Sequence, residues 1–239
     1  MNSNYGTNIV LVFDVETTGL LPKRPQQITL ESIKSCPYIL QLSFVLYDMD
    51  KQEIIRKFNS YVDVDDSIEI SPKITEITGI VRETCKNNGQ PIQDVLAEFY
   101  RAYIACDVVV AHNIDFDKEM IMIEVMRNFM KMLDNGCENP SIIFNEIHNV
   151  VYYKQLYCTM RNGKDFCDLW VEGKTEVRPE IKADGTVEEP NKRRYKKNPK
   201  LSELHFKIFN EIPDGLHDAL VDTLACLKCY IHLMSITKN

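Results

Sequence analysis

Short apolar runs occur at several places in this chain, each bounded by polar residues. Residues 9–13 form a run of five apolar side chains, and residues 108–111 form a second run of four. Runs of this length predict buried β-strands rather than helices. Residues 38–47 and 53–62 predict two more strands, and the polar stretch 48–51 between them predicts a hairpin turn.

Longer segments follow a helical period. Apolar residues recur at helical spacing over residues 91–104, and a stretch rich in Met and Ile predicts a helix over 115–133. Strands followed by helices that alternate with strands indicate an α/β domain with a mixed sheet. The remaining predicted elements are helices over 71–77, 163–170, 201–210 and 216–234 and a short strand over 157–160, whereas residues 134–150 give no clear pattern.

The composition is that of an ordinary globular protein. The 239 residues include 44% hydrophobic and 26% charged side chains, which suits one domain, residues 1–239, with a sizeable core. The N-terminus lacks the charged and apolar regions of a signal peptide, and no run of about 18 apolar residues predicts a membrane span. We therefore expect an intracellular protein, cytoplasmic or nuclear, that does not bind a membrane.

The net charge of −7 gives no support for nucleic-acid binding by the surface as a whole. A binder with this charge needs local basic patches and bound cations. The polar segment 171–199 ends in such a patch, and its low apolar content is typical of an insertion loop that is hard to order. Two interpretations stay open for the patch, a solvated loop and phosphate contacts through Lys192, Arg193, Arg194, Lys196 and Lys197.

Eight cysteines are scattered through the sequence. In a chain without a secretion signal, reduced thiols are the expected state rather than disulfides. Cys226 and Cys229 form a C-x-x-C pair, but no second pair of ligands lies at the spacing of a zinc site. Structural burial of these thiols is therefore favoured, with a zinc site as the alternative.

Three acidic motifs carry the candidate chemistry. In the first, Asp14 and Glu16 are two residues apart at the end of an apolar run, so the period of a strand puts both carboxylates on one face. Like charges at a buried strand end repel each other and lose hydration, and a hard divalent cation such as Mg²⁺ would compensate them. The alternative is a strand end whose acids are solvated.

The second and third motifs also have two interpretations each. Asp115 and Asp117 open a predicted helix, where an acid either caps free backbone N–H groups or serves as a ligand. His217 and Asp222 are five residues apart, about 140° around an ideal helix, so they converge only if His217 lies on the turn before the helix. A histidine that merely begins a helix is the alternative.

Together the three motifs are more specific than any one of them. All lie at the ends of apolar elements, where an α/β sheet places its ligand site. Four carboxylates from separate segments can hold two metal ions, one that prepares a water molecule and one that stabilises a leaving 3′ oxygen. A histidine ordinarily titrates near neutral pH and can take the proton of that water.

The stretches Asp14-Val-Glu-Thr-Thr-Gly-Leu20 and His112-Asn-Ile-Asp-Phe-Asp117, followed by His217 and Asp222, resemble the motifs of the DEDDh 3′–5′ exonuclease superfamily (DnaQ-like). The resemblance covers residues 8–235 and implies a ribonuclease H-like fold, with a central mixed five-stranded sheet flanked by helices and an insertion at 171–199. It selects Asp117 rather than Asp115. Thr78 departs from the family pattern, because it replaces a histidine in a His-Gly-Ile segment away from the metals.

The resemblance also implies roles for the five motif residues. Asp14, Glu16 and Asp222 would bind one of two divalent ions, Mg²⁺ or Mn²⁺. Asp14 would bridge to the second ion, which Asp117 would reach directly or through water. His217 would be the general base.

Substrate contacts are expected around the first two motifs. By the same resemblance, Thr17 and Leu20 are candidates for contacts with the sugar and base of the terminal nucleotide, where an apolar side chain can stack without regard to sequence. Asn113 and Phe116 are candidates for the pocket wall, with local hydrogen bonding and core packing as the alternative. The polar loop 21–37 is expected to form a rim of the substrate groove.

The expected activity is hydrolysis of the terminal phosphodiester of single-stranded DNA or RNA from its 3′ end, with release of 5′-mononucleotides. Candidate partners are the 3′ end of the strand and a polymerase or another replication or repair protein. One alternative is an inactive module of the same fold that binds nucleic-acid ends or docks on a polymerase. A zinc-dependent regulator is a second alternative.

Overall fold

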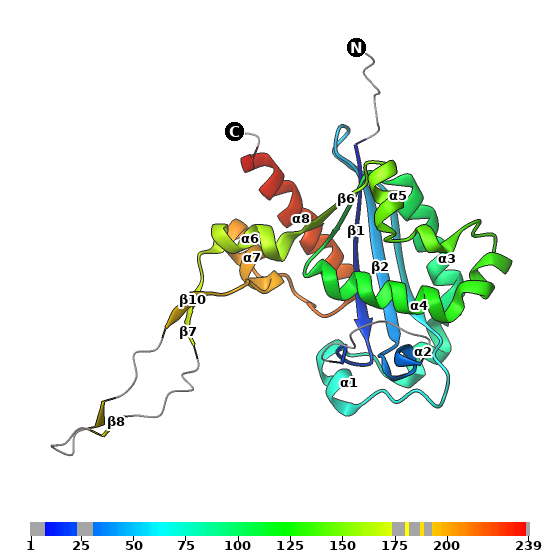
Figure 1. Ribbon diagram of the computed structural model, residues 1–239, viewed down its shortest axis with the longest axis horizontal. Coiled ribbons are helices and arrows are strands. Elements are labelled where there is room, and N and C mark those ends of the chain that lie inside the picture. Colours follow the sequence, from blue (N-terminus) through cyan, green and yellow to red (C-terminus); the bar gives the residue numbers. More distant parts are fainter. Residues whose placement is uncertain (1–7, 23–30, 174–179, 182–186, 189–192, 238–239) are drawn as a thin grey trace, which may run out of the picture.

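A central sheet of six strands organises the fold in a computed structural model that describes residues 8–22, 31–173, 180–181, 187–188 and 193–237 (Figure 1). The strands are β1 (Ile9–Thr17), β2 (Ile39–Asp48), β3 (Glu53–Val62), β4 (Gly89–Gln90), β5 (Val108–Ala111) and β6 (Gln155–Cys158). Their order across the sheet is β4-β3-β2-β1-β5-β6. β2 runs antiparallel to both β1 and β3, whereas β5 and β6 run parallel to β1, so the predicted mixed α/β sheet is confirmed.

The prediction of five strands is wrong by one. The sixth strand, β4, has two residues and pairs in parallel with the end of β3. Gly89 permits this pairing, because a Cβ atom there would lie 2.1 Å from the Cys85 carbonyl oxygen and 2.5 Å from the Asp63 nitrogen. Two residues are too few to show an apolar pattern, which is why periodicity does not predict the strand.

Helices and two small strand pairs complete the described chain. β7 (Trp170–Glu172) pairs with β10 (Arg194–Lys196), and β8 (Glu180–Ile181) pairs with β9 (Val187–Glu188), both antiparallel. β7 and β10 lie beyond α6 and α7, away from the central sheet (Figure 1). The helices are α1 (Pro72–Thr78), α2 (Arg82–Asn88), α3 (Ile92–Ala105), α4 (Ile114–Asp134), α5 (Glu146–Val151), α6 (Thr159–Cys167), α7 (Leu201–Phe209) and α8 (Ala219–Thr237), with 3₁₀ turns η1 (Ser32–Ser35) and η2 (Pro140–Ile142).

The two faces of β1 belong to two different core clusters. Leu11 and Phe13 pack in the larger cluster with residues of α3 and α4. Val10 and Val12 pack instead with Cys226 and other residues of α8. Since side chains alternate along a strand, the even-numbered residues that follow Val12 also face the side of the sheet that α8 covers.

A β-bulge lies at the carboxyl end of β1. Glu16 is opposite Gln41 on β2, but Thr17 is opposite Ile39, so Leu40 has no partner on β1. Before the bulge the register is regular back to Ile9. The extra residue therefore changes the direction of the chain only after the strand has delivered its acidic side chains.

Helix α8 is apolar enough to meet a membrane-span criterion. Its residues Ala219–Ile236 have a mean hydropathy of 1.4, and 44% of this window is buried. Cys226, Leu227 and Tyr230 of α8 pack against Val10 of β1 in one core cluster. These three residues of the helix thus have a partner in the sheet.

Candidate active site

The end of β1 places two carboxylates side by side. Asp14 and Glu16 are each part-exposed, and each is opposite a polar residue of β2, Ser43 and Gln41 respectively. Val15 between them is 5% exposed and packs in the core with α3 and α4. The alternation of the strand therefore turns both acids to the side that α8 covers.

Asp117 reaches the same strand from the first turn of α4. Its Oδ1 accepts a hydrogen bond of 3.3 Å from the backbone N–H of Val15, and the residue is 4% exposed. Asp115, two residues earlier, is exposed and forms an ion pair of 2.5 Å with Arg161. Asn113 has φ 68°, a left-handed conformation that begins the helix and turns Asp117 toward the sheet. The structure thus brings Asp117 and not Asp115 to Asp14 and its neighbours.

His217 lies on the turn before α8, as convergence with Asp222 requires. It has φ 73°, which is left-handed and marks the end of the turn that Gly215 begins. The backbone N–H of His217 donates a 3.3 Å hydrogen bond to Oδ2 of Asp222. Ligand atoms of Glu16, His217 and Asp222 all lie within 4.8 Å of one another.

Burial and mutual repulsion oppose ionisation of the four carboxyls. Burial, reinforced by Asp222 and Asp117, raises the pKa of Glu16 to about 8. Burial raises the pKa of Asp117 to about 8 and that of Asp222 to about 6. The pKa of Asp14 is raised well above its usual range by burial and then by its acidic neighbours.

The donor set fits divalent metal ions. Oδ1 of Asp222 is buried and has no hydrogen-bond partner. Among the described residues, no lysine or arginine forms an ion pair with Asp14, Glu16, Asp117 or Asp222. Uncompensated carboxylate oxygens are the ligands that Mg²⁺ and Mn²⁺ prefer. These four acids, with His217 beside them, are therefore the residues that could hold such ions.

The raised pKa values of Glu16 and Asp117 predict a pH-dependent stability. In the unfolded chain these groups lose their protons near their ordinary pKa values of 4.5 and 3.8, but in the folded protein only near pH 8. The folded state binds more protons between these limits, so the Tm of the metal-free protein should fall as the pH rises from 5 to 8. Mg²⁺ should bind the deprotonated, folded site and so raise the Tm more at pH 8 than at pH 5.

Thermal melts at both pH values, with Mg²⁺ and with chelator, measure this effect. The variant Asp117→Asn should reduce both the pH slope and the Mg²⁺ increment. An increment of Tm that is the same at the two pH values in the unsubstituted chain would contradict the prediction.

The candidate substrate contacts have different environments. Leu20 is 85% exposed just beyond β1, where it is free to meet a base. Thr17 is 6% exposed, and its hydroxyl donates to the carbonyl of Gly19 at 2.7 Å. Asn113 is exposed at the start of α4, and Phe116 is partly buried against the larger core cluster.

The basic patch is partly neutralised by local acids. Lys196 pairs with Asp165 and Asp168 at 3.0 and 2.9 Å, and Lys197 pairs with Glu203 at 2.5 Å. Arg193 and Arg194 are exposed, whereas Lys192 and much of the segment 171–199 lie outside the described residues. The described part of the patch thus offers two arginines more readily than it offers its lysines.

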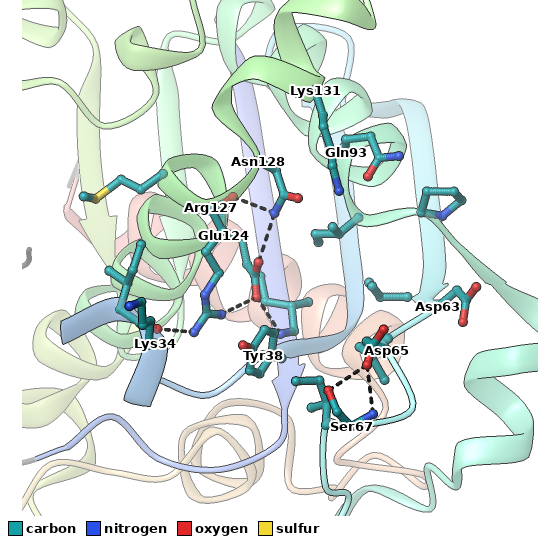
Figure 2. Close-up of a pocket in the computed structure, with 18 of the residues that line it drawn as sticks. Lys34, Tyr38, Asp63, Asp65, Ser67, Gln93, Glu124, Arg127, Asn128 and Lys131 are labelled. Atoms are coloured by element: carbon teal, nitrogen blue, oxygen red, sulfur yellow. Dashed lines mark hydrogen bonds and ion pairs between the residues drawn. The ribbon is translucent and has the colours of Figure 1, made fainter. Parts of the chain in front are cut away.

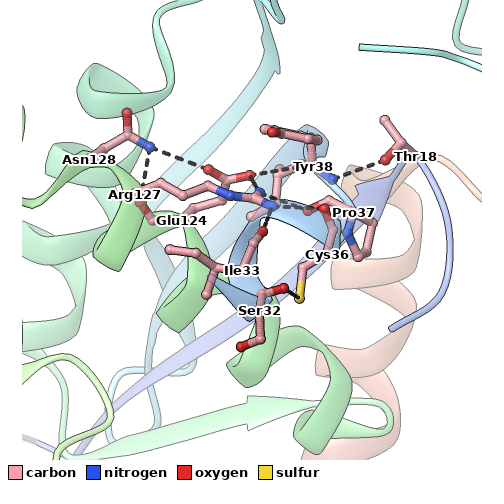
Figure 3. Close-up of polar contacts among 10 residues, drawn as sticks. Thr18, Ser32, Ile33, Cys36, Pro37, Tyr38, Glu124, Arg127 and Asn128 are labelled. Atoms are coloured by element: carbon pink, nitrogen blue, oxygen red, sulfur yellow. Dashed lines mark hydrogen bonds and ion pairs between the residues drawn. The ribbon is translucent and has the colours of Figure 1, made fainter. Parts of the chain in front are cut away.

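A buried arginine holds the segment that follows the first motif (Figure 3). The guanidinium of Arg127 donates to the carbonyls of Pro37 and Cys36 at 2.8 and 2.7 Å, and also to that of Ile33. It pairs with Glu124 at 2.8 Å, and the two side chains are 11% and 3% exposed. No sequence pattern had indicated this contact, because the arginine and the segment are about 90 residues apart.

The same segment is tied to the end of β1. The backbone N–H of Tyr38 donates to the hydroxyl of Thr18 at 2.9 Å, and the N–H of Thr18 donates to the carbonyl of Tyr38 at 2.9 Å. The ring of Tyr38 lies 3.9 Å from the guanidinium carbon of Arg127. Arg127 therefore holds the residues from Ile33 to Tyr38, and Tyr38 in turn is bonded to the end of β1.

A cavity of about 790 Å³ is lined in part by Ile33, Lys34 and Tyr38 (Figure 2). Its walls come from β2, the loop after β3, the start of α3 and the α4 residues Glu124, Arg127, Asn128 and Lys131. None of the five candidate catalytic residues lines it. The cavity is on the α3 and α4 side of the sheet, whereas the acids of β1 face the α8 side.

The eight cysteines behave as the sequence suggested. All are buried and none is in a disulfide. Cys226 and Cys229 lie in core clusters, and burial raises the pKa of both thiols. In the described part of the chain, the one cluster of potential metal ligands is that of Glu16, His217 and Asp222, which contains no cysteine.

Sequence comparison identifies the domain. A model of the RNase T exonuclease family matches residues 11–169 of this chain. The chain is similar to PolC-type DNA polymerase III of Halalkalibacterium halodurans, with 33% identity over 143 residues, and of Clostridium perfringens, with 31% identity over 116 residues. These matches span 59% and 48% of this chain but 8% and 7% of the relatives, so most of each relative has no counterpart here.

Solved structures agree with this at the level of the fold. Escherichia coli exonuclease I in complex with a dA16 oligonucleotide has a TM-score of 0.63 at 17% identity, over 95% of this chain and 41% of that one. A zinc-bound form of the same enzyme with single-stranded DNA has a TM-score of 0.64 at 15% identity, over 98% and 42%. The fold is thus the ribonuclease H-like fold of exonuclease I, and the chain belongs to the RNase T exonuclease family, within the DEDDh superfamily.

Proposed function

We propose that this chain is a 3′–5′ exonuclease that hydrolyses the terminal phosphodiester of single-stranded DNA or RNA and releases 5′-mononucleotides. The activity belongs to one domain, residues 1–239, with an insertion at about 171–199. Support comes chiefly from the meeting of four carboxylates around the unpaired, buried Oδ1 of Asp222. Membership of an exonuclease family supports the same activity.

The residues of the site divide the chemistry among them. Asp14, Glu16, Asp117 and Asp222 would hold the two divalent ions between them. When bound, two Mg²⁺ or Mn²⁺ ions supply the activation of the attacking water and the stabilisation of the leaving oxygen. A ring nitrogen of His217 takes the proton of that water as its oxygen bonds to phosphorus. The bond from phosphorus to the 3′ oxygen breaks, and that oxygen takes up a proton from solvent.

The substrate is held at the exposed side of the same strand end. Leu20 stacks beside the terminal base, Thr17 lies at its sugar, and Asn113 and Phe116 border the pocket. The oligonucleotides in the exonuclease I structures favour a single strand as substrate. The polymerase relatives favour a polymerase as partner, in which case removal of misincorporated nucleotides is one role of this activity.

A strand labelled at its 5′ end tests the proposal, with DNA and RNA as separate substrates. Mg²⁺ should produce a ladder that shortens from the 3′ end together with free 5′-mononucleotides, and chelator should stop the reaction. A circular single strand of the same sequence should stay intact, and its cleavage would show an endonuclease instead. Binding of strand ends without hydrolysis in Mg²⁺ and Mn²⁺ would favour the inactive end-binding module.

The basic patch is the proposed phosphate contact for the strand beyond the site. Because Lys196 and Lys197 have acidic partners, the double variant Arg193→Gln/Arg194→Gln should weaken strand binding more than Lys196→Gln/Lys197→Gln does. Each lost phosphate contact should lower the slope of log K against log salt concentration by about 0.7 for a single strand. Titrations of a fluorescent oligonucleotide at several salt concentrations measure this slope, and an unchanged slope in both variants would rule out the contact.

A further inference from the structure

A buried glutamine joins the sheet to the first turn of the helix that carries Asp222. Gln41 is 1% exposed on β2, directly opposite Glu16. Its Nε2 donates to Oδ2 of Asp218 at 2.9 Å, and its Oε1 accepts from the backbone N–H of Ala219 at 3.3 Å. One amide thus contacts two consecutive residues at the beginning of α8.

Asp218 passes this contact on to the helix. Its Oδ1 accepts from the N–H groups of Leu220 and Val221 at 3.0 and 3.1 Å, which caps the free end of α8. The cap lies between His217, one residue before it, and Asp222, one turn after it. A shift of this cap would therefore move the candidate base and a candidate metal ligand together.

The other side of Gln41 is also fixed. Its Nε2 makes a second donation, to Oδ1 of Asn59 on β3 at 3.0 Å, and the same oxygen accepts from the hydroxyl of Ser43 at 2.5 Å. Buried polar side chains in a network of this kind hold one another in a single orientation. The glutamine therefore cannot turn away from α8 without breaking contacts within the sheet.

We propose that Gln41 is a positioning residue, which clamps the first turn of α8 through Asp218 and Ala219 and so fixes His217 and Asp222 relative to Glu16. The effect on catalysis rests on the proposed exonuclease activity, whereas the hydrogen bonds between Gln41 and the first turn of α8 do not depend on it. Gln41 acts on the turn that carries His217, not on the strand that is cut. Its loss should therefore lower kcat and leave the KM for an oligonucleotide nearly unchanged.

A double-variant cycle tests the clamp by exchanging the donor and the acceptor of the hydrogen bond between Gln41 and Asp218. In Gln41→Glu the new carboxylate faces Asp218, and in Asp218→Asn the new amide faces the amide of Gln41. In the double variant Gln41→Glu/Asp218→Asn, a donor faces an acceptor again, the N–H of Ala219 keeps its acceptor, and the number of acids is that of the unsubstituted chain. Asn59, which accepts from Gln41, meets the new carboxylate by a flip of its amide that turns Nδ2 toward residue 41 in both variants that carry Gln41→Glu. Each single variant should lower kcat by about 10- to 100-fold, and the double variant should recover most of that loss.

Amide hydrogen exchange reports the clamp without reference to catalysis. The N–H groups of Ala219, Leu220 and Val221 should exchange about ten-fold faster in each single variant and return toward the unsubstituted rate in the double variant. Amides of β5 should not change in any of them.

The outcomes separate the two proposals. A double variant that is no faster than its slower parent, or a loss of kcat without faster exchange in α8, would overturn the positioning role. Faster exchange with unchanged kcat would overturn it as well. If the unsubstituted chain hydrolyses no strand, the proposed function fails, and unchanged exchange rates in the single variants would then still reject the clamp.

Discussion

The variant Asp117→Asn is expected to lose about a thousand-fold in kcat, because it removes a proposed ligand of the second metal ion. Metal ions supply several kcal/mol of transition-state stabilisation, and each factor of ten in rate corresponds to about 1.4 kcal/mol. The fold should survive the change. Asp117 is 4% exposed and burial raises its pKa, so a neutral amide of the same shape relieves a cost in the metal-free protein.

Asp115 provides the matched control for this prediction. It lies in the same turn of α4, but its side chain is exposed and pairs with Arg161. Asp115→Asn should therefore retain the activity of the unsubstituted chain. Single-turnover hydrolysis of a labelled strand, together with a thermal melt, measures both variants. Equal losses of activity in the two would show that the motif does not act through Asp117.

The variant Arg127→Met is expected to give the largest loss of stability, about 3–5 kcal/mol in the free energy of unfolding. The substitution would leave Glu124 buried without its cation and would remove the Arg127 donor from the carbonyls of Cys36 and Pro37, whereas the carbonyl of Ile33 keeps the N–H of Cys36. Unpaired buried groups of this kind cost far more than an exposed ion pair contributes. Urea denaturation at pH 7 measures the difference.

Helix α3 contains an exposed pair with the same spacing for comparison. Arg101 and Glu98 are also three residues apart and also 2.8 Å apart, but their side chains are 49% and 28% exposed. Arg101→Met should cost only about 0.2–1 kcal/mol, because water screens that pair and Glu98 keeps Arg56 as a partner. The double variant Arg127→Met/Glu124→Met should recover part of the loss, since it leaves no buried charge. An effect of Arg127→Met no larger than that of Arg101→Met would contradict the role given to the buried pair.

Local patterns were enough to predict the main strands and the longest helices. The apolar run at the start of β1 and the helical period of α3 and α4 are set by burial of the same faces that the sequence displays. Two boundaries were wrong for reasons of tertiary contact. The helix expected from residue 163 begins at Thr159, and Gly163 lies inside it, where a Cβ atom would be 2.8 Å from Leu204. In a sequence, a glycine that is required for close packing inside a helix looks the same as a glycine at a helix boundary.

The second boundary concerns the last helix. It was expected from residue 216, but α8 begins at Ala219, since Gly215 and His217 are both left-handed and Asp218 caps the helix after them. The aspartate before an apolar helical stretch was a signal for this cap that the sequence did contain. α2 was not predicted, and only Cys85 of that helix is buried, so it shows little apolar pattern.

Contacts across the fold were beyond such patterns. Gln41 and Asp218 are 177 residues apart, and nothing in their local sequences relates them. The only hint was the presence of polar Gln41 and Ser43 in an otherwise apolar strand, since a buried polar residue needs a partner. Periodicity could propose which acids lie at strand ends but could not separate Asp117 from Asp115. The family resemblance selected Asp117, and the three-dimensional arrangement gives the physical reason, since Asp117 bonds to Val15 of β1 whereas Asp115 pairs with Arg161.

The bulge at Leu40 has a consequence for how this protein can change. A one-residue slip between paired strands turns every following side chain to the opposite face. Here the irregular position comes after Glu16. A change in the length of the connection over residues 18–38 can therefore shift the strand register at the bulge, without changing the pairing of Asp14 and Glu16 with β2. New binding segments could therefore be grafted into this connection, by evolution or by design, while the acidic edge of β1 keeps its orientation.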